Sequence, residues 1–355
     1  MAFFGSQGSQ GSQGSQGSQG SQGSQGSQGS QAHAGGSAGP FLSEALITTR
    51  DGIARAWTGN GVLTDTAVPG AWDAYRKMAA RPRAAVLDHE FGKLFDINLP
   101  SGTEGQITSD VVDATFLVKL VRPNVDPAFV ADQLPFLRTY ADLRLDRVAE
   151  IQGQTNDLLS YFGALSYLDS EAKKRTVELL QAVLRLVTIL EMRMKLHFDF
   201  PRPITASASI QPIIQTPGHG SWPSGHATES FAVSIVLWSL MNVGSAVTAF
   251  DMVNDHEQPA RLAQRIAANR TIAGVHYPTD SMAGAILGLT VGEMIVNFLE
   301  GANKTPARDF DGVNFSGDFD LATLANEMNG ASDEDIIAVP SDILSSLWAV
   351  AKAEW

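Results

Sequence analysis

The stretch 218-GHGSWPSGHATES-230 places two histidines, a tryptophan, a proline and a serine directly before an apolar run. Apolar residues follow at helical spacing, which predicts a helix beginning at about residue 226. A helix N-terminus leaves backbone N–H groups unpaired and carries a partial positive charge, so it binds anions readily. Ser224 also fits a simple N-cap with His226 as a polar residue of the first turn. The stretch alone leaves both interpretations open.

The composition of the chain limits the classes of partner. Its 355 residues are 44% hydrophobic, carry a formal net charge of -13 and include no cysteine. Nucleic acids and anionic membrane surfaces attract basic faces, so we expect no nucleic-acid partner. The lack of cysteine excludes disulfides, thiolate catalysis and cysteine-based metal sites. An anion site in this acidic chain therefore needs a local cluster of positive charge.

The N-terminal region is distinguished by its repeats. Residues 5–31 repeat Gly-Ser-Gln, a composition that cannot bury enough apolar surface to fold. We interpret residues 1–40 as a disordered tail and linker, and 41–355 as a single α-helical catalytic domain with its motif core at 195–280. The opening "MAFF" shows no features of a signal peptide. A cytoplasmic location is the default expectation.

The remaining pattern predicts a mainly α fold. Apolar residues at helical spacing predict a long helix from about residue 169 to 195 and further helices at about 136–165, 226–242, 259–273, 280–300, 318–329 and 341–353. The segment 85–130 is mixed and is not assigned. The longest apolar window, 282–299, contains Glu293, and an intramembrane carboxylate is costly. We therefore expect a soluble helical bundle without a membrane span. The Asp-rich segment after Thr305 is interpreted as a packing or assembly surface, which would suit a homo-oligomer.

A first charged cluster lies in 195-KLHFDFPRP-203. Lys195 closes the predicted long helix, and Arg202 stands between Pro201 and Pro203. The prolines stop the helix and fix the backbone, so the guanidinium is presented from a rigid turn. The alternative is a lysine that stabilises a helix C-terminus and an arginine on a solvated turn.

A second cluster lies in 269-NRTIAGVHYPTD-280, which holds Arg270, His276 and Asp280. A carboxylate four residues after a histidine can accept a hydrogen bond from one ring nitrogen and leave the other free as a base or nucleophile. A capping aspartate beside an incidental histidine is one alternative. A divalent-metal pair formed by His276 and Asp280 is another.

Taken in order, the three clusters resemble the type 2 phosphatidic acid phosphatase and vanadium haloperoxidase superfamily. The resemblance rests on Lys195 with Arg202-Pro203, on Pro223 to His226, and on Arg270, His276 and Asp280, all within about 90 residues. It implies a helical bundle of the haloperoxidase and acid phosphatase type. Many members carry serine before the third-motif arginine, where this chain has Asn269.

The resemblance implies a role for each motif residue. His276 would attack phosphorus or bind vanadate, Asp280 would hold the histidine tautomer, and His226 would act as general acid or base. Arginine suits oxyanions because its fork donates paired hydrogen bonds. The implied cofactor is vanadate, for which phosphate competes. The implied oxyanion cage consists of Lys195, Arg202, Arg270, Ser224, the Gly225 N–H and His276.

Among these activities we favour a vanadium-dependent haloperoxidase that oxidises halide, bromide in preference to chloride, with hydrogen peroxide. The first motif is rich in aromatic residues, the chain reads as soluble, and His219 stands where haloperoxidases carry a residue that tunes the halide. An organic acceptor is left open, and so is the acidic residue that would orient His226. The alternative is a soluble acid phosphatase acting through a phosphohistidine, because "GSWPSGH" is also similar to the "GSYPSGH" of bacterial acid phosphatases. A second alternative is an inactive binding or structural protein.

Overall fold

The computed structural model describes residues 40–53, 59–62 and 67–355. The chain divides into two compact units, residues 1–87 and 88–355, and each is described by itself. The first unit contains helices α3 (Pro40–Ile53) and α4 (Ala71–Lys77), and α5 (Ala80–Gly92) crosses the boundary. The Gly-Ser-Gln repeat that we interpret as a tail lies outside the described residues. One catalytic domain over 41–355 stays a prediction.

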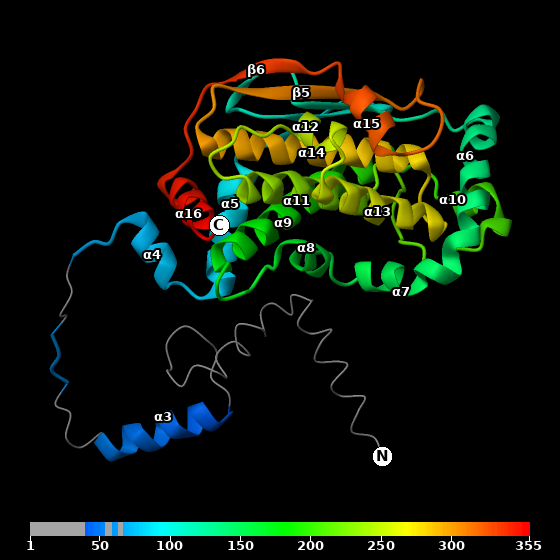
Figure 1. The fold of residues 1–355 in the computed structure, drawn as a ribbon. Helices are drawn as coiled ribbons and strands as arrows, with labels where there is room; N and C mark the ends of the chain where they lie inside the picture. The colour runs from blue at the N-terminus through cyan, green and yellow to red at the C-terminus, as the bar shows by residue number, and fades with distance from the viewer. Residues whose placement is uncertain (1–39, 54–58, 63–66) are drawn as a thin grey trace, which may run out of the picture. The chain divides into compact units, whose positions relative to one another are not determined.

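Four helices form the core of the second unit. They are α9 (Lys174–Phe198), α11 (Gly225–Met241), α13 (Gln258–Ile272) and α14 (Pro278–Glu300), and α11 packs against the other three (Figure 1). Helices that are apolar around their whole circumference are buried on all sides. That holds for α11 and α14, in which nearly every residue is buried.

Glycines let α14 approach α11 closely. A Cβ atom on Gly288 would overlap the carbonyl oxygen of Thr228 and lie 3.1 Å from the Ala232 nitrogen. A Cβ atom on Gly292 would lie 3.0 Å from the Ala232 oxygen, and one on Gly284 would overlap the Ser224 carbonyl oxygen. Only glycine permits this backbone contact. The contact fixes the first turn of α14 against the first turn of α11.

The other helices confirm a mainly helical fold. The single pattern expected over 136–165 is divided among α6, α7 and α8, and Asp157 before α8 accepts from the backbone N–H of Ser160 at 3.0 Å. The bounds are α6 (Pro127–Tyr140), α7 (Arg144–Gln154), α8 (Leu159–Ser166), α10 (Pro203–Ala206), α12 (Ala249–Asn254), α15 (Leu321–Met328) and α16 (Asp342–Ala353), with 3-10 turns at Ala141–Leu143 and Ala208–Ile210.

The expectation of an all-helical bundle is wrong because a six-stranded sheet accompanies the helices. Its order is β1-β2-β4-β5-β6-β3, and every neighbouring pair is antiparallel except the parallel pair β4 and β5. The unassigned 85–130 segment and the Asp-rich C-terminal segment supply the strands, which are too short to show a clear sequence period. Figure 1 shows β5 and β6 along α14. The strands are β1 (Asp96–Ser101), β2 (Glu104–Thr108), β3 (Val112–Asp113), β4 (Val118–Val121), β5 (Lys304–Asp311) and β6 (Ser332–Ile336).

Helix α14 is, among the described residues, the one helix long and apolar enough to cross a membrane. It is 94% buried within the protein over the window that passes this test, as core helices of compact proteins also are. Its carboxylate Glu293 pairs with Arg308 of β5 at 2.6 Å and accepts from the Ala249 backbone N–H at 2.8 Å. Pairing and hydrogen bonding offset the cost of burying this charge.

Candidate active site

The structure brings the three motifs together at the N-terminal ends of α11 and α14. Ser224 is the N-cap of α11, and its backbone N–H donates to the main-chain oxygen of Asp280 in the first turn of α14 at 2.8 Å. The first-motif residues arrive from the last turn of α9 and the start of α10, and the third motif from the end of α13. Buried within this cluster are Lys195, Arg202, Ser224, Arg270, His276 and Asp280.

The hydrogen bonds of His276 define its tautomer. His276 Nδ1 lies 2.8 Å from Asp280 Oδ2, which also accepts from the Tyr277 backbone N–H at 3.0 Å. Arg202 Nη1 lies 3.0 Å from His276 Nε2. Because a guanidinium can only donate, Nε2 carries the lone pair and Nδ1 carries the proton. This is the tautomer that a nucleophile at Nε2 requires.

Burial keeps the His276 ring neutral. It lowers the pKa of His276 well below its usual range, and the charges of Arg202 and Lys195 lower that pKa further. Burial also raises the pKa of Asp280 to about 7, against the lowering effects of the Tyr277 hydrogen bond and the two cations. The pair therefore carries its shared proton on Nδ1 of a neutral imidazole, beside the Asp280 carboxylate.

Arg202 links the loops of the second and third motifs. Its Nε donates to the His219 carbonyl at 3.0 Å, its Nη1 to the Val275 carbonyl at 2.8 Å and its Nη2 to the Gly220 carbonyl at 3.2 Å. His219 is exposed, and its Nδ1 lies 3.2 Å from Arg202 Nη2. His219 is thus located at the solvent edge of the cluster, and a role in tuning the reaction stays a prediction.

The Lys195 side chain holds the second-motif loop by donating to main-chain carbonyls of that loop. Its ammonium donates to the carbonyls of Gly220 at 3.5 Å, Ser221 at 3.2 Å and Pro223, the last of which follows a cis Trp222–Pro223 bond. Burial lowers the pKa of Lys195 to about 8, and the neighbouring Glu191 opposes that shift. Lys195 contributes charge to the site while its N–H groups support the loop.

Two of the expected cage residues, Arg270 and Ser224, have buried side-chain donors without a partner among the described residues. Arg270 Nη2 donates to Gln154 Oε1 at 2.8 Å and to the Ile151 carbonyl at 3.2 Å, whereas Arg270 Nε and Nη1 are buried with no partner among the described residues. Ser224 Oγ is likewise buried with no partner among the described residues. Buried donors without partners are costly and rare. Burial lowers the pKa of Arg270 only to about 10, so it stays a cation at neutral pH. These donors suit a tetrahedral oxyanion.

His226 contacts Gln154, which the sequence did not indicate. His226 Nε2 lies 3.0 Å from the main-chain oxygen of Gln154, so a carbonyl takes the place of the acidic residue that we had left open. Burial, together with the charge of Arg270, lowers the pKa of His226 to about 3. A main-chain acceptor at the end of α7 has no sequence signal.

Asn269, the departure from the family pattern, belongs to the same network. Its Nδ2 donates to Gln154 Oε1 at 3.0 Å and to Glu150 Oε1 at 2.8 Å. Glu150 is in turn paired with Arg265 at 2.7 Å. The amide therefore connects the third motif to α7.

Two carboxyl groups that the sequence analysis missed lie beside the cage. Glu191 precedes Lys195 by one helical turn, and a Cβ atom on Gly225 would lie 2.5 Å from its Oε1. Glu229 accepts from Thr188 Oγ1 at 3.2 Å. Burial raises the pKa of Glu191 well above its usual range and that of Glu229 to about 7. Glu191 lies four residues before Lys195, and Glu229 lies three residues after His226. This helical spacing could have placed both carboxyl groups beside the site from the sequence.

We expect the stability of Glu229→Gln, measured relative to the wild type, to be greater at pH 8.5 than at pH 5. The folded protein releases this proton near pH 7 and the unfolded chain near 4.5, so raising the pH through this window removes stability from the wild type. The amide does not titrate. Urea unfolding at both pH values should show a relative gain of about 2 kcal/mol. The exposed Glu171→Gln serves as control, and parallel pH curves for wild type and Glu229→Gln would contradict the assignment.

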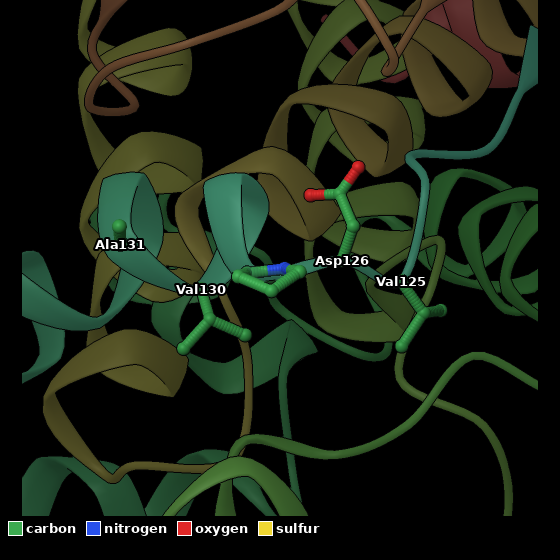
Figure 2. A pocket seen from close by; sticks show the side chains of 5 residues that line it. Val125, Asp126, Val130 and Ala131 are labelled. Carbon is green, nitrogen blue, oxygen red and sulfur yellow. The ribbon is translucent and has the colours of Figure 1, made fainter.

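A concavity of about 460 Å³ lies at the start of α6. Figure 2 shows Val125, Asp126, Val130 and Ala131 around it, and Pro127 completes the lining. No predicted site residue lines it. Phe129 of the same turn connects this region to the third motif by packing edge-on against Tyr277, with ring centroids 5.0 Å apart.

Comparisons with known proteins agree with the resemblance to the phosphatidic acid phosphatase superfamily. Residues 177–304 match the model of the PAP2 superfamily. The chain is 32% identical over 82 residues to decaprenylphosphoryl-5-phosphoribose phosphatase from two strains of Mycobacterium tuberculosis, CDC 1551 / Oshkosh and ATCC 25618 / H37Rv. That alignment covers 23% of this chain and 39% of each relative. A transmembrane PAP2 type phosphatidylglycerolphosphate phosphatase from Bacillus subtilis aligns at 17% identity over 50% of this chain and 79% of its own, with a TM-score of 0.27.

These matches support membership of the PAP2 superfamily. They give no support to a vanadium haloperoxidase in particular, and they favour the phosphatase alternative, because the curated relatives are phosphatases. The expectation of hydrogen peroxide and halide as partners, without a membrane span, is therefore wrong: the relatives are named for a lipid-linked phosphate. The default cytoplasmic location is wrong on the same finding, which points to a membrane.

Proposed function

We propose that the protein is a phosphatase that hydrolyses phosphate monoesters through a phosphohistidine at His276. The observation that carries the proposal is the pairing of a neutral His276, with its lone pair on Nε2, with the unpartnered buried donors of Arg270 and Ser224. A nucleophile beside an anion cage is the arrangement that phosphoryl transfer needs.

In the first step, His276 Nε2 attacks phosphorus and the bond from phosphorus to the ester oxygen breaks. For this attack, the hydrogen bond from Arg202 Nη1 to His276 Nε2 must break. The freed N–H of Arg202 can then donate to a phosphate oxygen. Asp280 stabilises the positive charge that forms on the imidazole, since it accepts from Nδ1. His226 gives its proton to the departing oxygen, which leaves as an alcohol.

In the second step, water attacks phosphorus and the bond to Nε2 breaks. His226, now neutral, takes a proton from the water and becomes a cation again, and it releases this proton to solvent when phosphate leaves. The low pKa of His226, about 3 in the empty site, is caused by burial and by the Arg270 charge. A bound phosphate dianion offsets that charge and raises the pKa of His226, so substrate binding itself prepares the acid.

The substrate class follows from the relatives. The curated phosphatases that this chain matches are named for a phosphate carried on a decaprenyl lipid, and the chain spans about two fifths of their length. Lipid-linked phosphate monoesters are therefore the first compounds to assay, with a soluble aryl phosphate as a general substrate.

Vanadate should inhibit this reaction in competition with phosphate. Five-coordinate vanadate has the shape of the phosphoryl-transfer transition state, and Arg270 and Ser224 offer it the same donors. We expect hydrolysis of the aryl phosphate and of a lipid phosphate in detergent micelles, micromolar inhibition by vanadate, and relief of that inhibition by millimolar phosphate. The proposal fails if neither ester is hydrolysed. If phosphate leaves vanadate inhibition unchanged, phosphate and vanadate do not bind at the same site.

A further inference from the structure

The last turn of α7 supports two groups of the site through a single residue. Gln154 is 2% exposed and contacts Arg270 through its side chain and His226 through its main-chain carbonyl. We propose that Gln154 is a positioning residue that holds the Arg270 guanidinium and the His226 ring in place before the oxyanion arrives. The proposal rests on the proposed function, because it assigns a role within that site.

The first contact fixes the plane of the arginine. Arg270 Nη2 has two acceptors on α7, Gln154 Oε1 at 2.8 Å and the Ile151 carbonyl at 3.2 Å. A guanidinium is rigid and planar, so fixing one nitrogen orients the others. Among the described residues, Nε and Nη1 have no partner. The contact thus selects which N–H groups are offered to the anion.

An amide is suited to this position because it accepts without adding charge. Gln154 Nε2 donates to Glu150 Oε1 at 3.0 Å, whereas Oε1 accepts from Arg270. Only this orientation of the amide satisfies both neighbours, since a carboxylate needs a donor and a guanidinium needs an acceptor. Glu150 is itself paired with Arg265. The amide separates the Glu150 charge from Arg270, whose own charge stays available to an oxyanion.

The second contact sets the proton on His226. A carbonyl oxygen can only accept, so the ring nitrogen 3.0 Å from it, Nε2, carries the hydrogen in the neutral imidazole. The nitrogen that gains and loses a proton during the reaction is then Nδ1. One turn of helix therefore fixes both the direction of the cage donors and the atom that performs proton transfer.

A double-mutant cycle between Gln154 and Arg270 tests the side-chain contact, with vanadate binding to the full-length protein as the readout. Gln154→Leu should weaken vanadate binding by roughly tenfold to a hundredfold, the usual effect of losing a hydrogen bond to a charged group. In an Arg270→Ala background the same change should weaken binding less than about threefold, because the group that Gln154 positions is gone. A general disturbance of α7 would give equal losses in both backgrounds and would overturn the proposal.

Gln152→Leu is the matched control, since it makes the same replacement at an exposed position of the same helix. It should leave vanadate affinity unchanged, and a loss equal to that of Gln154→Leu would overturn the proposal. Nitrogen NMR of the His226 ring should show the Nε2–H tautomer in both the wild type and Gln154→Leu, because the carbonyl remains. An Nδ1–H tautomer would overturn the second contact. If the wild type binds neither vanadate nor phosphate, the proposed function itself fails.

Discussion

Replacing His276 with alanine is expected to lower phosphate monoester turnover by at least ~10⁴-fold while leaving the protein folded. The replacement removes the atom that would form the covalent bond to phosphorus, and no other neutral nitrogen among the described site residues has its lone pair fixed by both a carboxylate and an arginine. Asp280 keeps its hydrogen bond from the Tyr277 backbone, so the start of α14 retains its cap.

The measurement pairs steady-state kinetics with thermal unfolding. The melting temperature should change little, and acid-labile labelling by a radioactive phosphate ester should disappear with the activity. His89→Ala is the control, because His89 is an exposed histidine of α5 outside the site. Normal turnover by His276→Ala would assign the covalent step to another residue. Loss of turnover with labelling retained would place His276 in the hydrolysis of the intermediate.

The site motifs could be predicted from the sequence because their spacing is local. Asp280 follows His276 by four residues across the start of a helix, and that spacing alone places the carboxylate within reach of the ring. Ser224 likewise marks the start of α11. Local geometry of this kind depends on a few backbone angles, which the neighbouring residues determine.

The contacts from α7 could not be predicted in this way. Gln154 lies 116 residues before Arg270 and acts partly through its backbone, whose position depends on how α7 packs against α13. The sheet was missed for a related reason. The parallel pairing of β4 with β5 joins segments that lie before and after the core helices in the sequence. No local pattern encodes a pairing between segments so far apart along the chain.

The three motifs alone also could not decide between a haloperoxidase and a phosphatase. The proposed cage of Arg202, Arg270 and Ser224 would suit phosphate and vanadate equally, because both are tetrahedral oxyanions that pass to five-coordinate geometry. Aromatic residues in the first motif led us to favour the haloperoxidase, which the comparisons support less than the phosphatase. Phe198 and Phe200 pack against Trp222 and Tyr277, so they build the core beneath the site.

The close approach of α11 and α14 had a sequence signal that we did not use. Gly284, Gly288 and Gly292 recur every four residues, which places them on one face of α14. We read their segment only as an apolar core helix. The three glycines face Ser224, Thr228 and Ala232 of α11, and the first of these contacts lies next to the hydrogen bond from Ser224 to Asp280.

Gly288→Ala is therefore expected to destabilise the protein by about 3 kcal/mol or more. The added Cβ would overlap the Thr228 carbonyl oxygen and lie 2.9 Å from its carbonyl carbon, and these are backbone atoms of a buried helix that no side-chain rotation can move away. The two helices must separate, which opens packing along their whole contact. Thermal unfolding should show a melting temperature lower by roughly 6–10 °C.

Gly330→Ala is the control, since a Cβ atom there would meet nothing within 4 Å and its melting temperature should match the wild type. Separation of α11 from α14 would also draw Ser224 away from Asp280, whose backbone hydrogen bond of 2.8 Å joins the anion cage to the His276 pair. Gly288→Ala should consequently lose turnover at temperatures where it is still folded, although Gly288 is not among the proposed site residues. An unchanged melting temperature would show that the helices separate without cost, and unchanged turnover in a destabilised variant would show that the site does not depend on their contact.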